Sequence, residues 1–275
     1  MKFFKYHGTG NDFIIIDNRG GVVDEEVKPE LSRRLCNRHF GVGGDGVIFV
    51  EKSVKADARM RIFNPDASEA EMCGNGIRCM AMFLYDKGMK HDRLRIETMA
   101  GLLEINLAFD DRGTALLTVD MGSPTGVELN RELEVDGDLW TYSYVDTGVP
   151  HAVFFVPDVE AVDLMRFAPL IRHNPVFPRG VNVNFVEKTG DSSFKIRTYE
   201  RGVEGETLAC GTGITASGAL AVYTGLAKDG VELEFQARGG TVYVRVEKDE
   251  KGMDRLFMTG PAVFVFEGDL SDTML

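Results

Sequence analysis

The chain has 275 residues, about twice the size of a typical single domain, so we expect two domains. With 44% apolar and 27% charged residues it has the composition of an ordinary globular protein. The net charge of −12 argues against nucleic acid and anionic membranes as partners, because no basic run offsets it. No window approaches 18 consecutive apolar residues, and the first residues lack the features of a signal peptide, so we expect neither a transmembrane span nor export.

The predicted elements of the first half alternate between strands and helices. A short helix is expected around Pro29–His39, and a longer one directly after Cys73, with apolar residues on one stripe and a stop at Gly88. Short β-rich runs predict the strands Val47–Glu51, Leu94–Glu97, Leu102–Leu107 and Ala115–Val119. Glycine, serine and proline in Asp120–Gly126 then indicate a linker.

The second half shows the same pattern. One clear helix follows Cys210 and stops at Gly225. The predicted strands are Val153–Val156, Val183–Val186, Phe194–Tyr199, Val231–Phe235, Thr241–Val246 and Ala262–Phe266.

An internal repeat explains this similarity. The segment from Cys73 to Ile77 (CGNGI) recurs from Cys210 to Ile214 (CGTGI), an offset of 137 residues, which is close to half the chain. Glu69 and Glu206 each lie four residues before their cysteine, and other matches keep nearly the same offset. The repeat predicts a duplicated unit, and so two similar domains related by a pseudo-twofold axis.

The two repeated cysteines are the candidate catalytic groups. Each is expected at the N-terminus of a helix, where bare backbone N–H groups bind anions and a thiolate is favoured. The pseudo-twofold axis would place the two thiols on opposite sides of a carboxylate-bearing carbon. That arrangement suits removal of a proton from one face and delivery of another to the opposite face, which is racemisation or epimerisation by two bases. Only one thiol should be ionised at a time.

Other readings of the cysteines are weaker. Cys36 and Cys79 are expected to be buried packing residues. Cys73 and Cys79 are six residues apart on a helix and cannot chelate together, so no metal is expected. A redox dithiol remains an alternative. A phosphate-binding loop is another, but the glycine-rich run Gly41–Gly46 lacks the lysine of that motif.

Three segments carry a family resemblance. Tyr6–Asn18 (YHGTGNDFIIIDN), Phe63–Cys79 (FNPDASEAEMCGNGIRC) and Thr198–Gly213 (TYERGVEGETLACGTG) closely resemble the diaminopimelate epimerase family, and the likeness covers essentially the whole chain. The resemblance implies interconversion of LL- and meso-2,6-diaminopimelate in lysine and peptidoglycan-precursor synthesis, without pyridoxal phosphate or other cofactor. It also implies a cytoplasmic homodimer that takes a small amino-acid substrate. The implied fold is α/β (α+β), with two domains, each a mostly antiparallel β-barrel-like sheet around a central helix. The domains are expected at residues 1–118 with 262–275, and at 119–261.

The resemblance also implies roles for single residues. Cys73 and Cys210 correspond to the acid/base pair. His151 and Glu200 correspond to residues that modulate the pKa of the thiols. The implied substrate-binding residues are Asn11, Asn64, Gly74, Asn75, Asn182, Glu200, Arg201, Gly211 and Thr212.

The chain departs from the family pattern at three positions. Val149 stands where many members have asparagine, Gly46 where many have glutamine, and Ala67 where a turn glycine is usual. The first two changes are expected to weaken side-chain contacts to the distal end of the substrate, and not to affect the reaction at the carbon. The alternative functions are a proline or hydroxyproline racemase-like enzyme on the same fold, a phenazine-type isomerase, and a catalytically silent carboxylate-binding protein.

Overall fold

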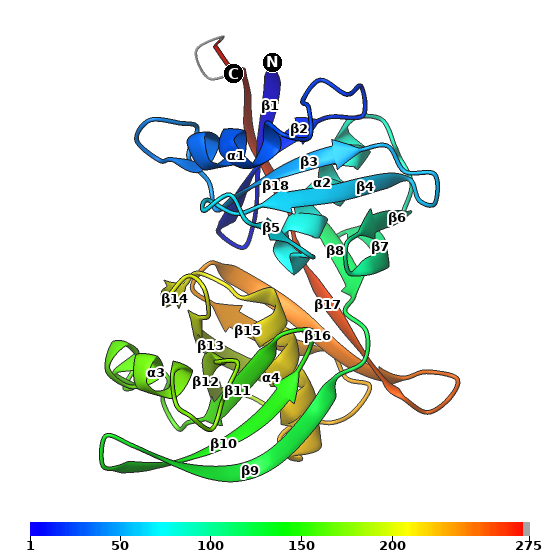
Figure 1. The fold of residues 1–275 in the computed structure, drawn as a ribbon. Coiled ribbons are helices and arrows are strands. Elements are labelled where there is room, and N and C mark those ends of the chain that lie inside the picture. Colours follow the sequence, from blue (N-terminus) through cyan, green and yellow to red (C-terminus); the bar gives the residue numbers. More distant parts are fainter. Residues whose placement is uncertain (272–275) are drawn as a thin grey trace. The chain divides into compact units, whose positions relative to one another are not determined.

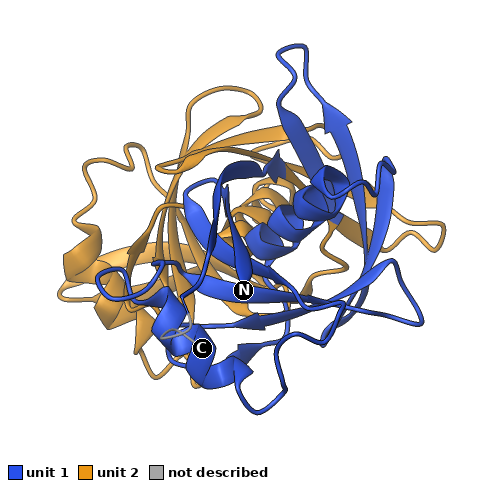
Figure 2. Ribbon diagram, turned by 90° about the horizontal axis from the view of Figure 1, so that it is seen from above, with its two compact units in different colours: residues 1–119, 260–275 blue, residues 120–259 orange. Residues whose placement is uncertain are grey.

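The computed structural model describes residues 1–271 and divides the chain into two compact units. Unit 1 comprises Met1–Val119 and the chain from Gly260 onward, and unit 2 comprises Asp120–Thr259 (Figure 2). The chain crosses between them within β8 (Ala115–Asp120) and within β17 (Asp254–Pro261). The domain boundaries expected from the sequence, at 118/119 and 261/262, lie beside these two junctions. Residues 272–275 of the expected first domain lie outside the described part.

Unit 1 is a sheet that holds a helix (Figure 1). The strands pair in the order β18-β1-β2-β3-β4-β6-β7-β8, with β5 added beside β4; β2–β3 and β4–β6 are parallel and the other pairs antiparallel. The bounds of its elements are α1 (Lys28–Cys36), α2 (Gly74–Asp86), β1 (Lys2–Gly8), β2 (Asn11–Asp17), β3 (Gly46–Glu51), β4 (Ala58–Phe63), β5 (Glu69–Ala70), β6 (Arg93–Thr98), β7 (Gly101–Phe109) and β18 (Val263–Asp269).

Unit 2 repeats this order of pairing. Its strands pair as β9-β10-β11-β12-β13-β15-β16-β17, with β14 beside β13 and with β11–β12 and β13–β15 parallel. The bounds of its elements are α3 (Leu164–Arg172), α4 (Gly211–Tyr223), β9 (Thr125–Val135), β10 (Asp138–Asp146), β11 (Pro150–Phe155), β12 (Asn182–Lys188), β13 (Ser193–Glu200), β14 (Gly205–Thr207), β15 (Leu233–Ala237) and β16 (Gly240–Lys248).

The two central helices differ in their pattern of burial. In α2 the expected stripe of Ile77, Met80, Ala81 and Leu84 is fully buried against the strands of unit 1. Helix α4 is rich in small residues and is buried on nearly every face. At Gly218 a Cβ atom would lie 2.5 Å from Val244 Cγ1, so this position has no room for a side chain.

The mixed α/β fold class and the positions of the predicted strands and helices are confirmed. The first short helix ends at Cys36 and does not extend to His39. The expected linker is shorter than the sequence indicated, because Thr125 and Gly126 already belong to β9. Among the described residues, none of the helices combines the length and apolar character that a membrane span requires.

Candidate active site

In unit 1, Cys73 lies at the N-terminus of α2. Its backbone is extended at φ −141° and ψ 120°, it is the N-cap residue, and its sulfur accepts a hydrogen bond from Gly76 N at 3.4 Å. Gly74 and Asn75 form the first positions of the helix, whose backbone N–H groups are the ones an α-helix leaves without intrahelical partners. The sulfur therefore lies at the positive end of the helix dipole.

Two asparagine side chains surround this cysteine. Cys73 Sγ lies 3.9 Å from Asn11 Oδ1, and Asn75 Nδ2 donates to the same oxygen at 3.2 Å. On its other side, Asn11 Nδ2 donates to Asp45 Oδ2 at 2.7 Å. The structure thus brings Asn11, Asn75 and Cys73 together, although Asn11 and Cys73 are 62 residues apart in sequence.

A buried arginine supports this group from the helix side. Arg78 is completely buried in α2 and donates to Asn75 Oδ1 at 2.9 Å, to Thr9 Oγ1 at 3.4 Å and to the Gly74 carbonyl at 3.4 Å. Two glycines make room for it, because a Cβ atom at Gly8 or at Gly260 would lie 3.1 Å from Arg78 Nη2. Burial lowers the pKa of this guanidinium.

Asn64 lies in the turn between β4 and β5. Its Nδ2 donates to Ser68 Oγ at 3.0 Å. Its backbone N–H donates to Ser68 O at 2.8 Å, and its backbone carbonyl accepts a hydrogen bond from Ala67 N at 3.0 Å. Ala67 has φ +71°, a left-handed conformation that a side chain disfavours, which explains why a glycine is usual there. In this structure Asn64 braces a turn.

In unit 2, Cys210 occupies the position equivalent to Cys73. It is the N-cap residue of α4, which like α2 has 13 residues, and its side chain is almost fully buried. Gly211 and Thr212 form the first helical positions, and the sulfur lies 3.5 Å from Thr212 Oγ1. Each unit therefore presents one thiol at one helix N-terminus.

A buried polar network supports the N-terminus of α4. Asn184 Nδ2 donates to Ala152 O at 3.2 Å and lies 3.3 Å from His151 Nδ1, while Asn184 Oδ1 accepts from Thr198 Oγ1 at 2.9 Å. This oxygen touches the helix at Gly213, where a Cβ atom would lie 2.3 Å from it and 3.4 Å from Cys210 Cβ.

His151 is neutral in this network. Burial lowers its pKa to about 3, with a further lowering by the charge of Arg201. Because Asn184 Nδ2 points at Nδ1 as a donor, the ring proton lies on Nε2. Nε2 is buried and has no hydrogen-bond partner among the described residues, so the ring leaves one buried donor unused.

The other candidates of unit 2 lie at the start of β12 and at the end of β13, which are neighbouring antiparallel strands. Asn182 Nδ2 donates to Pro150 O at 3.1 Å, and Asn182 Oδ1 accepts from Arg201 N at 2.8 Å. Glu200 ends β13, and the Arg201 side chain donates to Arg179 O at 3.0 Å. This hydrogen bond from Arg201 N holds the Asn182 side chain against the backbone at the end of β13, so the positions of these two candidates are linked.

An ion pair recurs in both units just before each cysteine. Arg61 on β4 binds Glu69 on β5, and Arg197 on β13 binds Glu206 on β14 at 2.7 Å. The repeated glutamates of the sequence are therefore explained, since each ties the short strand that leads to a cysteine. The arginines, like Asp45, Arg78 and Asn184, are supporting residues that sequence reasoning did not single out.

The remaining two cysteines are not part of the candidate site. Burial raises the pKa of the Cys36 thiol to about 12, and it raises the pKa of Cys79 as well, so both are packing residues as expected.

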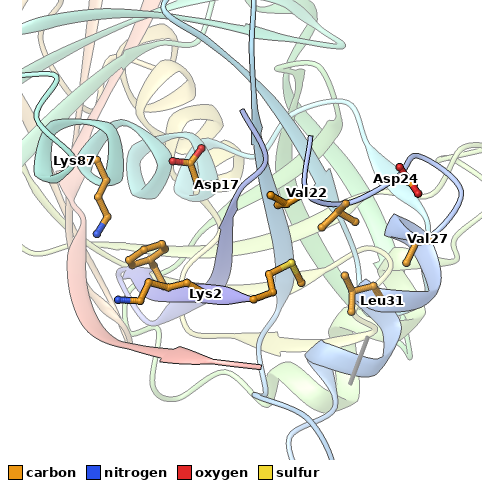
Figure 3. Close-up of a pocket in the computed structure, with 10 residues that line it drawn as sticks. Lys2, Asp17, Val22, Asp24, Val27, Leu31 and Lys87 are labelled. Atoms are coloured by element: carbon orange, nitrogen blue, oxygen red, sulfur yellow. The ribbon is translucent and has the colours of Figure 1, made fainter. Parts of the chain in front are cut away.

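A cavity in unit 1 also lies apart from the candidate site. It has a volume of about 670 Å³ and is lined by apolar side chains such as Val27 and Leu31 together with Lys2 and Lys87, and none of the candidate site residues lines it (Figure 3). Within residues 1–271, histidine, cysteine and acidic side chains form no cluster of three or more that could hold a metal ion.

The arrangement can support acid–base chemistry. Each unit offers a thiol, backbone N–H groups for a carboxylate and nearby amide or hydroxyl groups. The described candidates divide into Asn11, Asn64, Cys73, Gly74 and Asn75 in unit 1, and His151, Asn182, Glu200, Arg201, Cys210, Gly211 and Thr212 in unit 2.

Comparison with known proteins identifies relatives along the whole chain. Residues 3–127 and 143–265 match a family model described as diaminopimelate epimerase. A protein named diaminopimelate epimerase from Methanocella arvoryzae is 45% identical over 279 residues, covering 98% of this chain and 96% of the relative.

Solved structures share the fold at lower identity. A phenazine biosynthesis protein of the PhzF family from Bacillus anthracis matches with a TM-score of 0.78 and 23% identity, covering 98% of this chain and 99% of that one. A hydroxyproline epimerase from Agrobacterium vitis matches with a TM-score of 0.74 and 18% identity, covering 98% and 90%. At these identities the likeness concerns the fold alone.

Proposed function

Since the chain belongs to the diaminopimelate epimerase family, we propose that it interconverts LL- and meso-2,6-diaminopimelate with Cys73 and Cys210 as a two-base pair. Family membership makes the chain an isomerase that acts on diaminopimelate. The assignment of the two cysteines is supported by one observation above all: each is the N-cap residue of the 13-residue central helix of its unit, and the two units share one strand order.

The proposed reaction needs no group beyond these side chains. One cysteine thiolate takes the proton from the α-carbon, so that a C–H bond breaks and an S–H bond forms. The electron pair left on the carbon delocalises into the α-carboxylate. The other cysteine thiol then delivers its proton to the opposite face, which inverts the carbon and leaves a thiolate on that side.

The helix N-termini suit the charge that develops. Backbone N–H groups at Gly74, Asn75, Gly211 and Thr212 can donate to the substrate carboxylate as it gains charge. We assign the carboxylate and ammonium contacts of the substrate to Arg201 and Glu200, and amide contacts to Asn11, Asn64 and Asn182. The unpartnered Nε2–H of His151 supports its assignment, with Glu200, as a residue that modulates the thiol pKa.

We further propose that each unit is a domain and that the enzyme is a cytoplasmic homodimer. Strand β18 pairs with β1 and leaves four successive apolar residues exposed: Val263, Phe264, Val265 and Phe266. Successive side chains of a strand point to opposite faces, so neither face of β18 is fully covered. A second copy of the chain would cover this surface. The four free cysteines are compatible with a reducing compartment.

The main alternative is a proline or hydroxyproline racemase on the same fold. The fold likeness to the hydroxyproline epimerase keeps it as a candidate, whereas the family match and the 45% identity favour diaminopimelate.

The test is incubation of the enzyme in D₂O with LL-diaminopimelate, L-proline or trans-4-hydroxy-L-proline, followed by NMR of the α-proton. We expect exchange and meso product with diaminopimelate alone. Exchange of the proline substrates without exchange of diaminopimelate would overturn the proposal.

A further inference from the structure

The turn that carries Arg201 is closed by Glu204. The backbone N–H of Glu204 donates to Glu200 O at 2.9 Å, and its carboxylate oxygen Oε1 accepts from Gly202 N at 3.0 Å. Arg201 therefore lies inside a turn that Glu204 holds by both its backbone and its side chain. Glu204 itself has φ +56°, a left-handed conformation that a residue with a side chain disfavours. Such conformations persist where the surrounding structure fixes them, and they are frequent at functional sites.

Helix α3 fixes the Glu204 carboxylate from outside the turn (Figure 1). Arg172, in the last turn of α3, donates to Glu204 Oε1 from Nη2 at 2.9 Å and from Nε at 3.2 Å. The other oxygen, Oε2, lies 3.5 Å from the Tyr199 hydroxyl and 3.4 Å from His173 Nε2. The Arg172 side chain is only 14% exposed, so this end of the ion pair is shielded from water. The carboxylate thus ties the turn to a helix residue 32 positions earlier in the chain.

Arg172 also touches the second segment that holds Arg201. A Cβ atom at Gly180 would overlap Arg172 Nη1, so the guanidinium lies directly against the backbone there. The carbonyl of the preceding residue, Arg179, accepts from Arg201 Nη1 at 3.0 Å. One guanidinium therefore braces both the turn that carries Arg201 and the segment whose carbonyl receives the Arg201 side chain.

We propose that Glu204 and Arg172 are positioning residues that hold Arg201 in the orientation in which it binds a substrate carboxylate. This inference rests on the proposed function, which assigns that contact to Arg201. Because the helix N-termini receive the carboxylate of the reacting carbon, Arg201 is left for the carboxylate at the other end of the substrate. A contact there is the same before and during the reaction, so its loss raises KM and leaves kcat nearly unchanged.

A second ion pair on the same helix provides a matched control. Arg166 of α3 binds Asp136 at 2.6 Å, and Asp136 also has a positive φ, of +54°, in the turn between β9 and β10. This pair joins α3 to a turn just as the pair of Arg172 and Glu204 does. None of the residues that we assign to the substrate lies in the turn between β9 and β10.

The first measurement is hydrogen–deuterium exchange of the full-length enzyme, followed by mass spectrometry of the peptides that cover residues 199–206. In Glu204→Ala the turn loses its side-chain bonds to Gly202 and Arg172, and we expect its amides to exchange about tenfold faster. Glu204→Gln should keep most of the wild-type protection, because its amide oxygen can take the place of Oε1. Asp136→Ala should leave these peptides unchanged.

The second measurement is steady-state kinetics with LL-diaminopimelate. We expect Glu204→Ala to raise KM about tenfold and to change kcat less than about threefold, whereas Glu204→Gln and Asp136→Ala keep KM within about threefold of the wild type. In an Arg201→Ala background, Glu204→Ala should add nothing to KM, because Glu204 acts through Arg201. A purely structural loss would instead reduce activity by the same factor in both backgrounds.

Arg172→Gln tests the same bonds from the helix side, and it replaces Glu204→Ala if that variant does not fold. It removes the donors that meet Oε1 and leaves the carboxylate of Glu204 in place. We expect exchange in the turn and KM to rise as in Glu204→Ala, with kcat again nearly unchanged.

Unchanged exchange in the peptides of the turn would overturn the proposal, and this measurement does not depend on activity. A fall in kcat in place of the rise in KM, or an equal rise in KM with and without Arg201, would also overturn it. If the wild type does not epimerise diaminopimelate, the proposed function fails, and the exchange measurement alone decides whether Glu204 and Arg172 hold the turn.

Discussion

His151 shows at the scale of one residue how burial defines a chemical role. Its imidazole is fully buried, and its folded-state pKa of about 3 lies far below the usual 6.5. Because the unfolded chain binds a proton that the folded chain excludes, stability is complete above pH 6.5 and is lost as the pH falls toward 3.

This linkage gives a prediction for His151→Gln. Between pH 7 and pH 5, the free energy of unfolding of the wild type should fall by about 2 kcal/mol more than that of the variant. Urea denaturation at both pH values measures the difference. His91→Gln, at an exposed histidine, should keep the wild-type pH dependence. An unchanged pH dependence in His151→Gln would show that the imidazole is not held neutral.

Sequence reasoning reached the two cysteines and the residues beside them because their motifs are local. Gly74 and Asn75 follow Cys73 directly, and their position at the helix start is a property of the motif. It did not reach Asp45 or Arg78 as supporting residues. The contact of Asp45 with Asn11 spans 34 residues, and its existence depends on how β2 and the loop before β3 pack.

At the scale of elements, helices α2 and α4 were predictable because each starts directly after a cysteine followed by glycines and is followed by a further glycine, Gly88 or Gly225, just beyond its end. Strand β9 was not, because nearly all its residues are exposed and their charges hide the alternation that marks a strand. Helix α3 contains Pro169, which favours a break in a sequence-based reading.

The N-terminus of α4 gives a prediction about glycine. In Gly213→Ala the new Cβ would lie 2.3 Å from Asn184 Oδ1, so the network beneath Cys210 must shift. We expect a stability loss of about 1–3 kcal/mol and a fall in kcat of about a hundredfold.

Gly218→Ala is the matched control for this experiment. Its Cβ would lie 2.5 Å from Val244 Cγ1 in the middle of the same helix, so it should lose stability but keep most of its kcat. Thermal unfolding and steady-state kinetics on both variants separate the two effects. An equal loss of kcat in both would show that the helix N-terminus has no special role.

At the scale of the whole molecule, β18 carries the prediction on assembly. Val265 is 50% exposed in the middle of the apolar surface of this strand. We expect the wild type to sediment as a dimer and Val265→Glu as a monomer, because a buried unpaired carboxylate opposes association. Val54→Glu, at a fully exposed valine elsewhere in unit 1, should remain dimeric. A dimeric Val265→Glu would assign the interface to another surface.

The duplication was also visible from the sequence, because the CGNGI and CGTGI segments keep the offset of half the chain. The full extent of the repeat was not, since α1 matches α3 in topology without a shared motif. The order of strand pairing therefore shows the duplication even where the residues of the two units no longer match.

The central claim is that one thiol from each half of the duplication handles one face of the substrate carbon. The most direct measurement is epimerisation of LL-diaminopimelate by Cys73→Ala and Cys210→Ala, with Cys36→Ala as the control at a buried packing cysteine. We expect each catalytic variant to lose about 10²–10⁴-fold in the rate of meso product formation, while Cys36→Ala keeps most of its activity. Near-normal epimerisation by either Cys73→Ala or Cys210→Ala would contradict the two-base account.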